Sequence, residues 1–440
     1  MTAGDGADGE LESIVTAIPG PRSRALAEEL ARYEPPGVTY LGADYPVFWE
    51  RASGALVTDA DGNRYIDLTA AFGVAATGHT NPRVADAVAE QAHTLIHGMG
   101  DVHPTEVRVR LLARLAALAP GDLRKTYLST SGADAVEFAL KTALLATGKP
   151  RVIAYRGAYH GLSLGALEVA GIEKFRAPFA PLVADRATFL SYPGADASLL
   201  GAIGAVRDAL ARDPEIGAIV VEPVQGRGGV IIPPDGFLRA LRELCDERGL
   251  LLVLDEIYTG FGRTGTMFAC EREHVVPDIL CAGKALAGGL PLAATIGTAR
   301  VMDAWPPSTG EALHTSTFLG NPAACAAALA NLDELERLDI AGRVRAHEAG
   351  LGARLRTLRA FASVRDVRGL GFLWAVEFAD AAFANRVVVR ALANGVILLQ
   401  SGPTGTSITV APPLTIGERQ LSRALELFER TVRETEEASS

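Results

Sequence analysis

Lys284 stands in a segment rich in Ala, Gly and Leu, PDILCAGKALAGGLPLAA at 277–294. An amine in an apolar site loses solvation, so its pKa falls and it becomes a nucleophile for a carbonyl carbon. The alternative is that the charged end of the side chain reaches solvent, which is the commoner fate of a lysine. The two glycines that follow weaken a helix and favour close contact with another group.

An acidic pair, Asp255 and Glu256, ends the apolar run LLLVLDEI at 250–257. Ionised carboxylates there are costly unless they meet a cation or hydrogen-bond donors. On this pattern alone, capping a helix or forming a structural ion pair is as good an explanation as chemistry. The Gly-rich turn after the pair lets backbone approach a ligand closely.

Strands and helices alternate through the middle of the chain, which predicts an α/β sheet with helices on both faces. The short apolar runs are typical of parallel strands buried on both faces; they lie at 151–155, 217–224 and 250–257. Helical segments are expected at 132–147, 196–211 and 235–248. Ligands bind outside the carboxyl ends of such strands. We therefore expect the chemistry just after Tyr155, Val221 and Leu254.

The two ends of the chain differ from the middle in composition and in their pattern of apolar residues. Residues 1–12 are rich in Gly, Asp and Glu and are expected to form a disordered tail. The segment 57–68 predicts a hairpin around its Asp-Gly-Asn turn. An Ala/Leu/Arg-rich helix at 322–358, several strand-like pieces and a final helix at 417–436 predict a smaller α+β domain.

Charge and cysteine usage exclude several classes of protein. The net charge of -10 argues against nucleic acid or an anionic membrane as partner, because both repel negative charge. Four scattered cysteines in 440 residues do not resemble a disulfide framework, so buried free thiols are expected. No basic-then-apolar leader and no run of about 20 apolar residues is present, and a cytoplasmic enzyme is the default expectation. No His/Cys/Asp cluster has metal-ligand spacing, so no metal is expected.

The spacing of Asp255 and Lys284 and seven further segments, in order, resemble the class III aminotransferases. This is the fold-type I pyridoxal-phosphate family that includes 4-aminobutyrate, ornithine and acetylornithine aminotransferases. The resemblance spans roughly residues 45 to 430. Its segments are GHTNPRV (78–84), STSGADAVEFALK (129–141), AYRGAYHG (154–161), IVVEPVQGRGG (219–229), STFLGNPAACAAAL (316–329), VRGLGFLWAVEF (367–378) and VAPPLTI (410–416).

The resemblance implies a large domain with a mostly parallel mixed sheet flanked by helices and a smaller α+β domain formed by both chain ends. The implied bounds are 13–70 for an N-terminal segment of the small domain, 71–325 for the large domain that binds pyridoxal 5′-phosphate, and 326–440 for the C-terminal part of the small domain. It also implies a homodimer, or a higher homo-oligomer, with shared active sites.

The resemblance implies roles for residues at the reacting end of the cofactor. Lys284 would hold the cofactor aldehyde as a Schiff base, and its freed amine would then move the proton between substrate and cofactor carbons. Asp255 would keep the pyridine nitrogen protonated. Glu222 would be a hydrogen-bonding partner in the site, and His160 would lie beside the cofactor as a structural hydrogen-bonder.

Other positions would hold the cofactor ring and phosphate. Tyr159 would stack on one face of the ring, and Ile257, on the same strand face as Asp255, would press on the other. The start of a helix would present backbone N–H groups and a positive dipole to the phosphate. The phosphate-binding residues would be Ser131, Gly132 and Ala133, with the hydroxyl of Thr317 coming from the neighbouring subunit.

Three residues depart from better-known members of the family. Tyr258 stands where many relatives have a Gln that holds the cofactor phenolate; it would donate the same bond or point away. Arg227 replaces a Glu that pairs with an active-site arginine, and Thr409 stands in that arginine's place. Arg227 would then bind a substrate carboxylate from another side, or pair on the loop surface. Phe72 aligns with a substrate-facing aromatic, and is otherwise a core residue.

The leading prediction is an aminotransferase that moves an amino group from an amine, an amino acid or an ω-amino acid to a 2-oxo acid, by a ping-pong reaction through the pyridoxamine form. Alternatively, the donor has no α-carboxylate, as in a diamine, an ω-amino acid or an amino sugar. An epimerase or racemase, or a decarboxylase of dialkylglycine type, would use the same residues and is the alternative. A cofactor-binding protein without turnover is a third.

Overall fold

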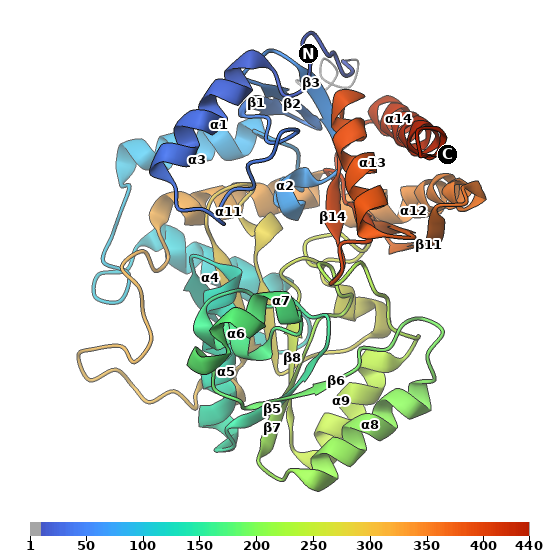
Figure 1. Cartoon of the computed structure of the whole chain (residues 1–440). Coiled ribbons are helices and arrows are strands. Elements are labelled where there is room, and N and C mark those ends of the chain that lie inside the picture. The colour runs from blue at the N-terminus through green and yellow to red at the C-terminus, as the bar shows by residue number, and fades with distance from the viewer. Residues whose placement is uncertain (1–9, 440) are drawn as a thin grey trace. The chain divides into compact units, whose positions relative to one another are not determined.

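The computed structural model describes residues 10–439 and divides them into two compact units. The central unit comprises Pro82–Glu348 with Gly369–Leu373. The terminal unit comprises the described residues up to Asn81, Ala349–Arg368, and the described residues from Trp374 onward. Its two chain ends are blue and red in Figure 1.

A seven-stranded sheet forms the core of the central unit, in the order β4-β10-β9-β8-β7-β5-β6. Only β10 runs against the others, because it pairs antiparallel with both β9 and β4. The mostly parallel mixed sheet is therefore confirmed. The strands are β4 (Leu123–Ser129), β5 (Arg151–Tyr155), β6 (Ala187–Leu190), β7 (Ile216–Val221), β8 (Leu251–Asp255), β9 (Ile279–Ala282) and β10 (Ala293–Thr298).

Helices lie on both sides of this sheet, with α5 and α6 on one side and α8 and α9 on the other (Figure 1). The core between α5 and the sheet is built from small residues such as Ala135, Ala139 and Ala218. The helices of this unit are α3 (Pro82–Thr94), α4 (Glu106–Leu118), α5 (Gly132–Thr147), α6 (Leu164–Val169), α7 (Glu173–Arg176), α8 (Leu199–Arg212), α9 (Phe237–Arg248), α10 (Ala299–Met302) and α11 (Pro322–Arg337). Short 3-10 turns lie at Ala177–Leu182, Ala269–Glu273 and Lys284–Leu286.

Helix α5 begins where its sequence predicts. The Ser131 hydroxyl caps it by accepting the Asp134 N–H at 3.2 Å, and Gly148 ends it in the left-handed region at φ 69°. Asp134 in the first turn complements the positive end of the helix dipole. These local signals explain why the observed bounds match the predicted 132–147.

The single helix predicted at 322–358 is wrong in its continuity. It is two helices, α11 and α12 (Ile340–Arg356), separated by Asp339, whose φ of 42° is left-handed. Helix α11 packs on α3 and α4 within the central unit. The proposed domain boundary at 325/326 accordingly falls inside α11.

Both chain ends contribute strands to one sheet of the terminal unit, ordered β1-β2-β3-β13. The predicted hairpin is present as β2 (Leu56–Asp59) and β3 (Arg64–Asp67), and β13 (Val396–Ile397) pairs parallel with β3. The predicted disordered tail lies mostly outside the described residues. Its last part, 10–12, was predicted wrongly, because the Leu11 carbonyl accepts from Arg64 and Glu12 pairs with Arg423 at 2.7 Å.

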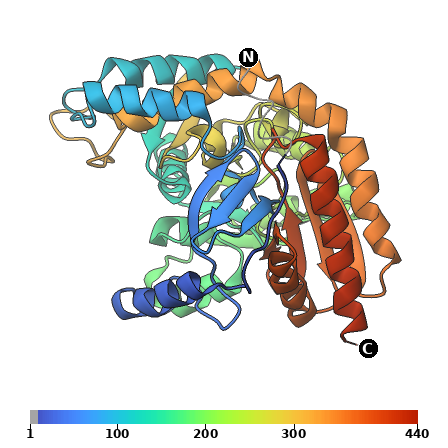
Figure 2. The ribbon, with the colours of Figure 1, turned by 90° about the horizontal axis from the view of Figure 1, so that it is seen from above.

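A second sheet of the terminal unit has the order β11-β12-β15-β14. Helix α13 packs against α14, the helix that ends at the C-terminus in Figure 2. The other elements here are α1 (Pro21–Tyr33), β1 (Trp49–Ser53), α2 (Ala70–Gly73), a 3-10 turn (Thr357–Ala360), β11 (Val364–Leu370), β12 (Leu373–Phe378), α13 (Ala381–Ala393), β14 (Leu399–Ser401), β15 (Ser407–Val410) and α14 (Glu418–Glu437).

All four cysteines are buried free thiols, as expected. Within residues 10–439, no helix has both the length and the apolar character needed to cross a membrane. Over the same residues, no group of three or more His, Cys, Asp or Glu side chains is arranged to hold a metal ion.

Ile219, at the centre of the large sheet, tests this core. Its side chain is fully buried in β7, opposite Ile153 and Leu252. Ile219→Ala should lower the free energy of unfolding of the central unit by about 2–5 kcal/mol in urea denaturation, because it removes buried methylenes and leaves a cavity. Leu200→Ala is the matched control, 87% exposed on α8, and should change it by less than about 0.5 kcal/mol. Equal losses in both variants would contradict the assigned core.

Candidate active site

A cavity of about 320 Å³ opens at the carboxyl ends of β5, β7 and β8, where ligands are expected in such a sheet. Its lining brings together residues from five separate chain segments of the central unit. They are Gly132, Ala133, Tyr159, His160, Gly161, Leu162, Glu222, Arg227, Asp255, Ile257, Tyr258 and Lys284.

Asp255 ends β8 and turns its carboxylate into this cavity. One carboxylate oxygen lies 2.7 Å from Nδ1 of His160, and the other accepts the Ile257 N–H at 3.0 Å. Burial lowers the pKa of His160, but the hydrogen bond and charge of Asp255, aided by Glu222, raise the pKa above its ordinary value. His160 is 2% exposed and its Nε2 is a buried nitrogen for which no hydrogen-bond acceptor is found among the described residues. The contact with Asp255 therefore favours the protonated form of His160.

The neighbouring Glu256 is structural. Its buried carboxylate accepts N–H groups of Ala269 at 2.9 Å and Cys270 at 2.8 Å, together with the hydroxyl of Thr259. Burial raises the pKa of Glu256 above its ordinary range. The acidic pair is thus divided, with Asp255 at the cavity and Glu256 holding the turn that follows.

Glu222 follows β7 and joins two loops of the cavity. One carboxylate oxygen accepts the Tyr159 N–H at 2.9 Å and the other accepts the Gly226 N–H at 3.0 Å. Burial raises the pKa of Glu222 to about 7, the His160 charge opposes the rise, and the Asp255 charge adds to it. This carboxyl therefore exchanges its proton near neutral pH.

Lys284 faces these two carboxylates across the cavity. Burial lowers the pKa of its amine, while the charges of Asp255 and Glu222 oppose the decrease. Its backbone is left-handed at φ 38°, which is uncommon for a residue other than glycine and marks a fixed local conformation. The sequence-based expectation of an amine with a lowered pKa agrees with this environment.

Tyr258 and Arg227 lie at the same cavity. The Lys284 Nζ atom is 4.5 Å from the centre of the Tyr258 ring. Burial lowers the pKa of Arg227, and the nearby Tyr159 and Tyr258 oppose the decrease. Tyr258 therefore lines the cavity rather than pointing away from it, and Arg227 supplies a partly desolvated cation.

The start of α5 provides the opposite wall. Gly132 and Ala133 line the cavity, and the first N–H groups of a helix have no acceptor within the helix. Ile257 packs against Gly132, where an added Cβ would lie 2.8 Å from Ile257 Cδ1. The strand ends at Asp255, so Ile257 reaches the cavity from the turn and the expected strand-face argument is wrong. Ser131 caps the helix with its hydroxyl and does not line the cavity.

Three further expected site residues are not among the lining residues of this cavity. Thr317 is exposed in the 303–321 connection and does not line this cavity. In the terminal unit, Phe72 is 63% exposed in α2, where its φ of 63° is left-handed, so the core alternative for this residue is wrong. Thr409 is buried in β15, and its hydroxyl donates to Ser401 Oγ at 2.7 Å.

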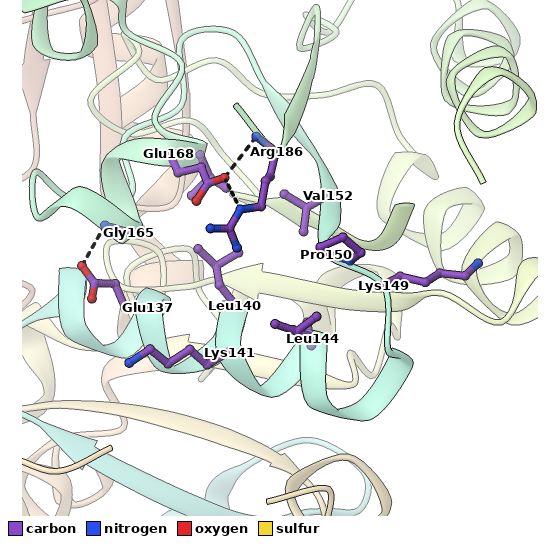
Figure 3. A pocket seen from close by; sticks show the side chains of 12 residues that line it. Glu137, Leu140, Lys141, Leu144, Lys149, Pro150, Val152, Gly165, Glu168 and Arg186 are labelled. Atoms are coloured by element: carbon purple, nitrogen blue, oxygen red, sulfur yellow. Dashed lines mark hydrogen bonds and ion pairs between the residues drawn. The ribbon is translucent and has the colours of Figure 1, made fainter. Parts of the chain in front are cut away.

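A second cavity, of about 200 Å³, lies between α5, α6 and the edge strands of the large sheet (Figure 3). Its two glutamates each have a partner within the lining. Glu137 accepts the Gly165 N–H at 3.1 Å, and Glu168 accepts the Arg186 N–H at 3.1 Å and pairs with the guanidinium at 3.6 Å. This cavity lies at the amino ends of β5 and β6, whereas ligands bind at the carboxyl ends of such strands, so we assign the chemistry to the first cavity.

Residues 40–432 match the family model described as aminotransferase class-III. The chain belongs to this family. It is 41% identical to the 4-aminobutyrate aminotransferase of Mycobacterium tuberculosis H37Rv, over 94% of this chain and 96% of that one. It is 42% identical to the acetylornithine aminotransferase of Methanopyrus kandleri, over 87% and 93%.

A solved structure with the same fold is the ornithine aminotransferase of Toxoplasma gondii ME49, with a TM-score of 0.85, 30% identity and 94% and 96% coverage. The fold-type I architecture is therefore confirmed. The protein is an aminotransferase that uses pyridoxal 5′-phosphate.

The cavity of this aminotransferase fits that cofactor. It offers an amine for an aldehyde, a buried carboxylate for a pyridinium, and a helix start for a phosphate. Gly132 and Gly161 keep the space open. A Cβ on Gly161, whose φ is 121°, would lie 2.5 Å from the Ala133 Cβ atom.

Gly161 and Leu162 are lining residues that sequence reasoning missed. Gly161 was within reach of that reasoning, because it directly follows His160 in the aromatic segment at 154–161. Leu162 has no comparable signal, since an isolated leucine beyond a glycine is common on any surface.

The raised pKa of Glu222 makes stability depend on pH. Its folded-state pKa lies above the ordinary value of 4.5, so the folded chain binds this proton more tightly than the unfolded chain. The associated stability is present at low pH and is lost as pH rises from about 4.5 through 7. Between pH 5 and 8, the melting temperature of the cofactor-free wild type should fall by a few degrees more than that of Glu222→Gln. Parallel pH profiles for the two proteins would contradict this assignment.

Proposed function

We propose that Lys284 is the residue that holds pyridoxal phosphate covalently and transfers protons during transamination. The observation that supports this most directly is the placement of its amine at one cavity with Asp255, Glu222 and the start of α5. When bound, the cofactor supplies an aldehyde that takes up an amino group and a pyridinium that withdraws electrons.

Asp255 would hold a proton on the pyridine nitrogen. A carboxylate at this position favours the charged ring, and the 2.7 Å contact with His160 holds the Asp255 carboxyl group in place. Tyr159 and Ile257 would contact the ring. Glu222 fixes the Tyr159 backbone through its 2.9 Å hydrogen bond.

The freed Lys284 amine would carry a proton from one carbon to the other. A base for this step must be neutral, and burial favours that form of the amine. The charges of Asp255 and Glu222 favour the protonated form, which must also exist when the proton is delivered. These opposing effects support both the uptake of the proton by the neutral amine and its delivery by the charged amine.

The phosphate would bind the N–H groups of Gly132 and Ala133, which line the cavity, and that of the N-cap residue Ser131 directly before them, where the dipole of α5 favours an anion. The hydroxyl of Thr317 would come from the neighbouring subunit of a homodimer. This proposal is supported by the exposure of Thr317 and of nearby apolar residues such as Ile96, Met99 and Phe318.

Arg227 would bind the substrate carboxylate, which makes an amino acid or ω-amino acid the donor and a 2-oxo acid the acceptor. Its guanidinium lines the cavity and is partly desolvated, which strengthens a bond to an anion. The substrate roles of Phe72 and Thr409, and the bounds of the two domains, stay predictions. A cytoplasmic location is part of the proposal and is supported by the four free thiols.

A half-reaction tests the proposed role of Lys284. Mixed with an amino-acid donor and no acceptor, the wild type should release about one equivalent of oxo acid per site and then stop. Lys284→Ala should release it at least about 100-fold more slowly, because it lacks the base. Carbon dioxide release, or racemisation without oxo acid, would support the decarboxylase or epimerase alternative. An unchanged rate in Lys284→Ala would contradict the role of this lysine.

Arg227→Ala tests the carboxylate site. Loss of a charged hydrogen bond of about 1.5–3 kcal/mol should raise KM for the acid substrate about 10- to 100-fold. Arg212→Ala, at the exposed end of α8, is the matched control and should leave KM unchanged. An unchanged KM in Arg227→Ala would mean that the guanidinium pairs on the loop surface instead. It would also favour a donor without an α-carboxylate.

Hybrid dimers test the shared phosphate site. Thr317→Ala should weaken cofactor binding about 3- to 30-fold, and Lys284→Ala should lose turnover. A mixed dimer of the two variants would have one site with both residues intact. The two variants are unfolded and refolded together so that their subunits mix at random. A fraction of the sites, equal to that expected for mixed dimers, should then turn over with wild-type cofactor affinity. Turnover that keeps the weak affinity of Thr317→Ala would contradict a threonine supplied by the partner.

A further inference from the structure

The ring of Tyr258 faces the amine of Lys284. The Nζ atom lies 4.5 Å from the ring centre, within the roughly 6 Å over which an aromatic face attracts a cation. Attraction of this kind acts on the charged amine and depends on the ring face, whereas a hydrogen bond would depend on the hydroxyl.

The loop at Gly226 fixes the position of the Tyr258 ring. A Cβ on Gly226 would lie 2.2 Å from Cδ1 of the ring, so the ring packs directly on the glycine backbone. The Gly226 N–H donates to Glu222 at 3.0 Å, and its neighbour Gln225 is bridged to Ile231. The ring therefore packs against a loop that is held at two points.

The backbone of Tyr258 is fixed as well. Glu256, two residues earlier, accepts two N–H groups of the 269–270 turn, and its carbonyl accepts the Gly260 N–H at 2.9 Å. Hydrogen bonds therefore hold the turn before and after Tyr258. The backbone that carries the ring is therefore held in place.

Lys284 approaches the ring from a defined direction. Its left-handed φ of 38° follows Gly283, where an added Cβ would come within 3.3 Å of both Ile257 and Ala293. The Gly283 backbone therefore packs closely against the side chains of Ile257 and Ala293. The contact between ring and amine therefore joins two segments whose backbones are closely packed.

We propose that Tyr258 is a positioning residue whose ring face holds the Lys284 amine in place whenever that nitrogen is not bonded to the cofactor, and favours its charged form. The catalytic meaning of this contact rests on the proposed function of Lys284. The contact itself exists in the chain without cofactor.

Several groups around Lys284 act on the pKa of its amine, and the ring contributes to their balance. Burial lowers the pKa of the amine, and Asp255 and Glu222 act against burial. The ring, like the two carboxylates, favours the charged form of the amine. His160 acts on this balance through its contact with Asp255. Since these effects oppose one another, a modest change in one of them changes the neutral fraction of the amine.

Chemical labelling of the cofactor-free full-length chain tests the proposal. The sequence has five lysines, so acetylation of each is resolved by peptide mass spectrometry. The neutral amine is the form that reacts. Tyr258→Leu removes the ring, and the labelling rate of Lys284 at pH 7 should rise about two- to tenfold. Lys125, whose side chain is 50% exposed on β4, is the internal reference and should react equally in all proteins.

Tyr258→Phe keeps the ring and should match the wild type. Tyr258→Gln introduces the side chain of many relatives, which has no ring face, and should behave like Tyr258→Leu. Gly226→Ala should displace the ring and raise the rate without changing Tyr258 itself. A rise in Tyr258→Phe equal to that in Tyr258→Leu would assign the effect to the hydroxyl and overturn the proposal. No rise in Tyr258→Leu would overturn it as well.

The labelling result is separate from the proposed function. If the cofactor attaches to another lysine while Tyr258→Leu still raises labelling of Lys284, the ring contact stands and the function of Lys284 is wrong. If Lys284 carries the cofactor and labelling is unchanged, the function stands and the role of Tyr258 is wrong. Melting temperatures of the variants show whether folding has changed.

Discussion

The site depends on three ionisable groups that lie at one cavity: the Lys284 amine and the carboxyl groups of Asp255 and Glu222. Burial lowers the pKa of the amine and raises that of Glu222, and each charge makes the opposite charge less costly. His160 extends the set by contacting Asp255. Burial and the nearby carboxyl groups act in opposite directions on the Lys284 pKa, and this suits the amine to both bonding and proton transfer.

The fold supplies these groups from the ends of parallel strands. Asp255 ends β8, Glu222 follows β7, and the Tyr159–His160 pair lies in the loop after β5. Adjacent residues have separate tasks, because Asp255 faces the cavity while Glu256 holds the turn that carries Tyr258. Glycines at 132, 161 and 226 permit the close approach of these loops.

The sequence was most predictive where local chemistry and burial act together. Helix α5 has the predicted bounds because Ser131 and Gly148 mark its ends, and the apolar runs became parallel strands because both of their faces are buried. The break at Asp339 was missed, since its Ala/Leu/Arg-rich surroundings favour an unbroken helix and one left-handed residue leaves little trace. The direction of Tyr258 depends on Gly226, more than 30 positions away, and no local pattern contains that contact.

The most direct measurement of the central claim is to trap the cofactor on the chain. Borohydride reduction makes the bond between lysine and cofactor permanent, and peptide mass spectrometry then identifies the modified lysine among the five in the sequence. The account predicts one phosphopyridoxyl group per chain, on Lys284. A label on Lys125, Lys141, Lys149 or Lys174 with Lys284 unmodified would contradict it.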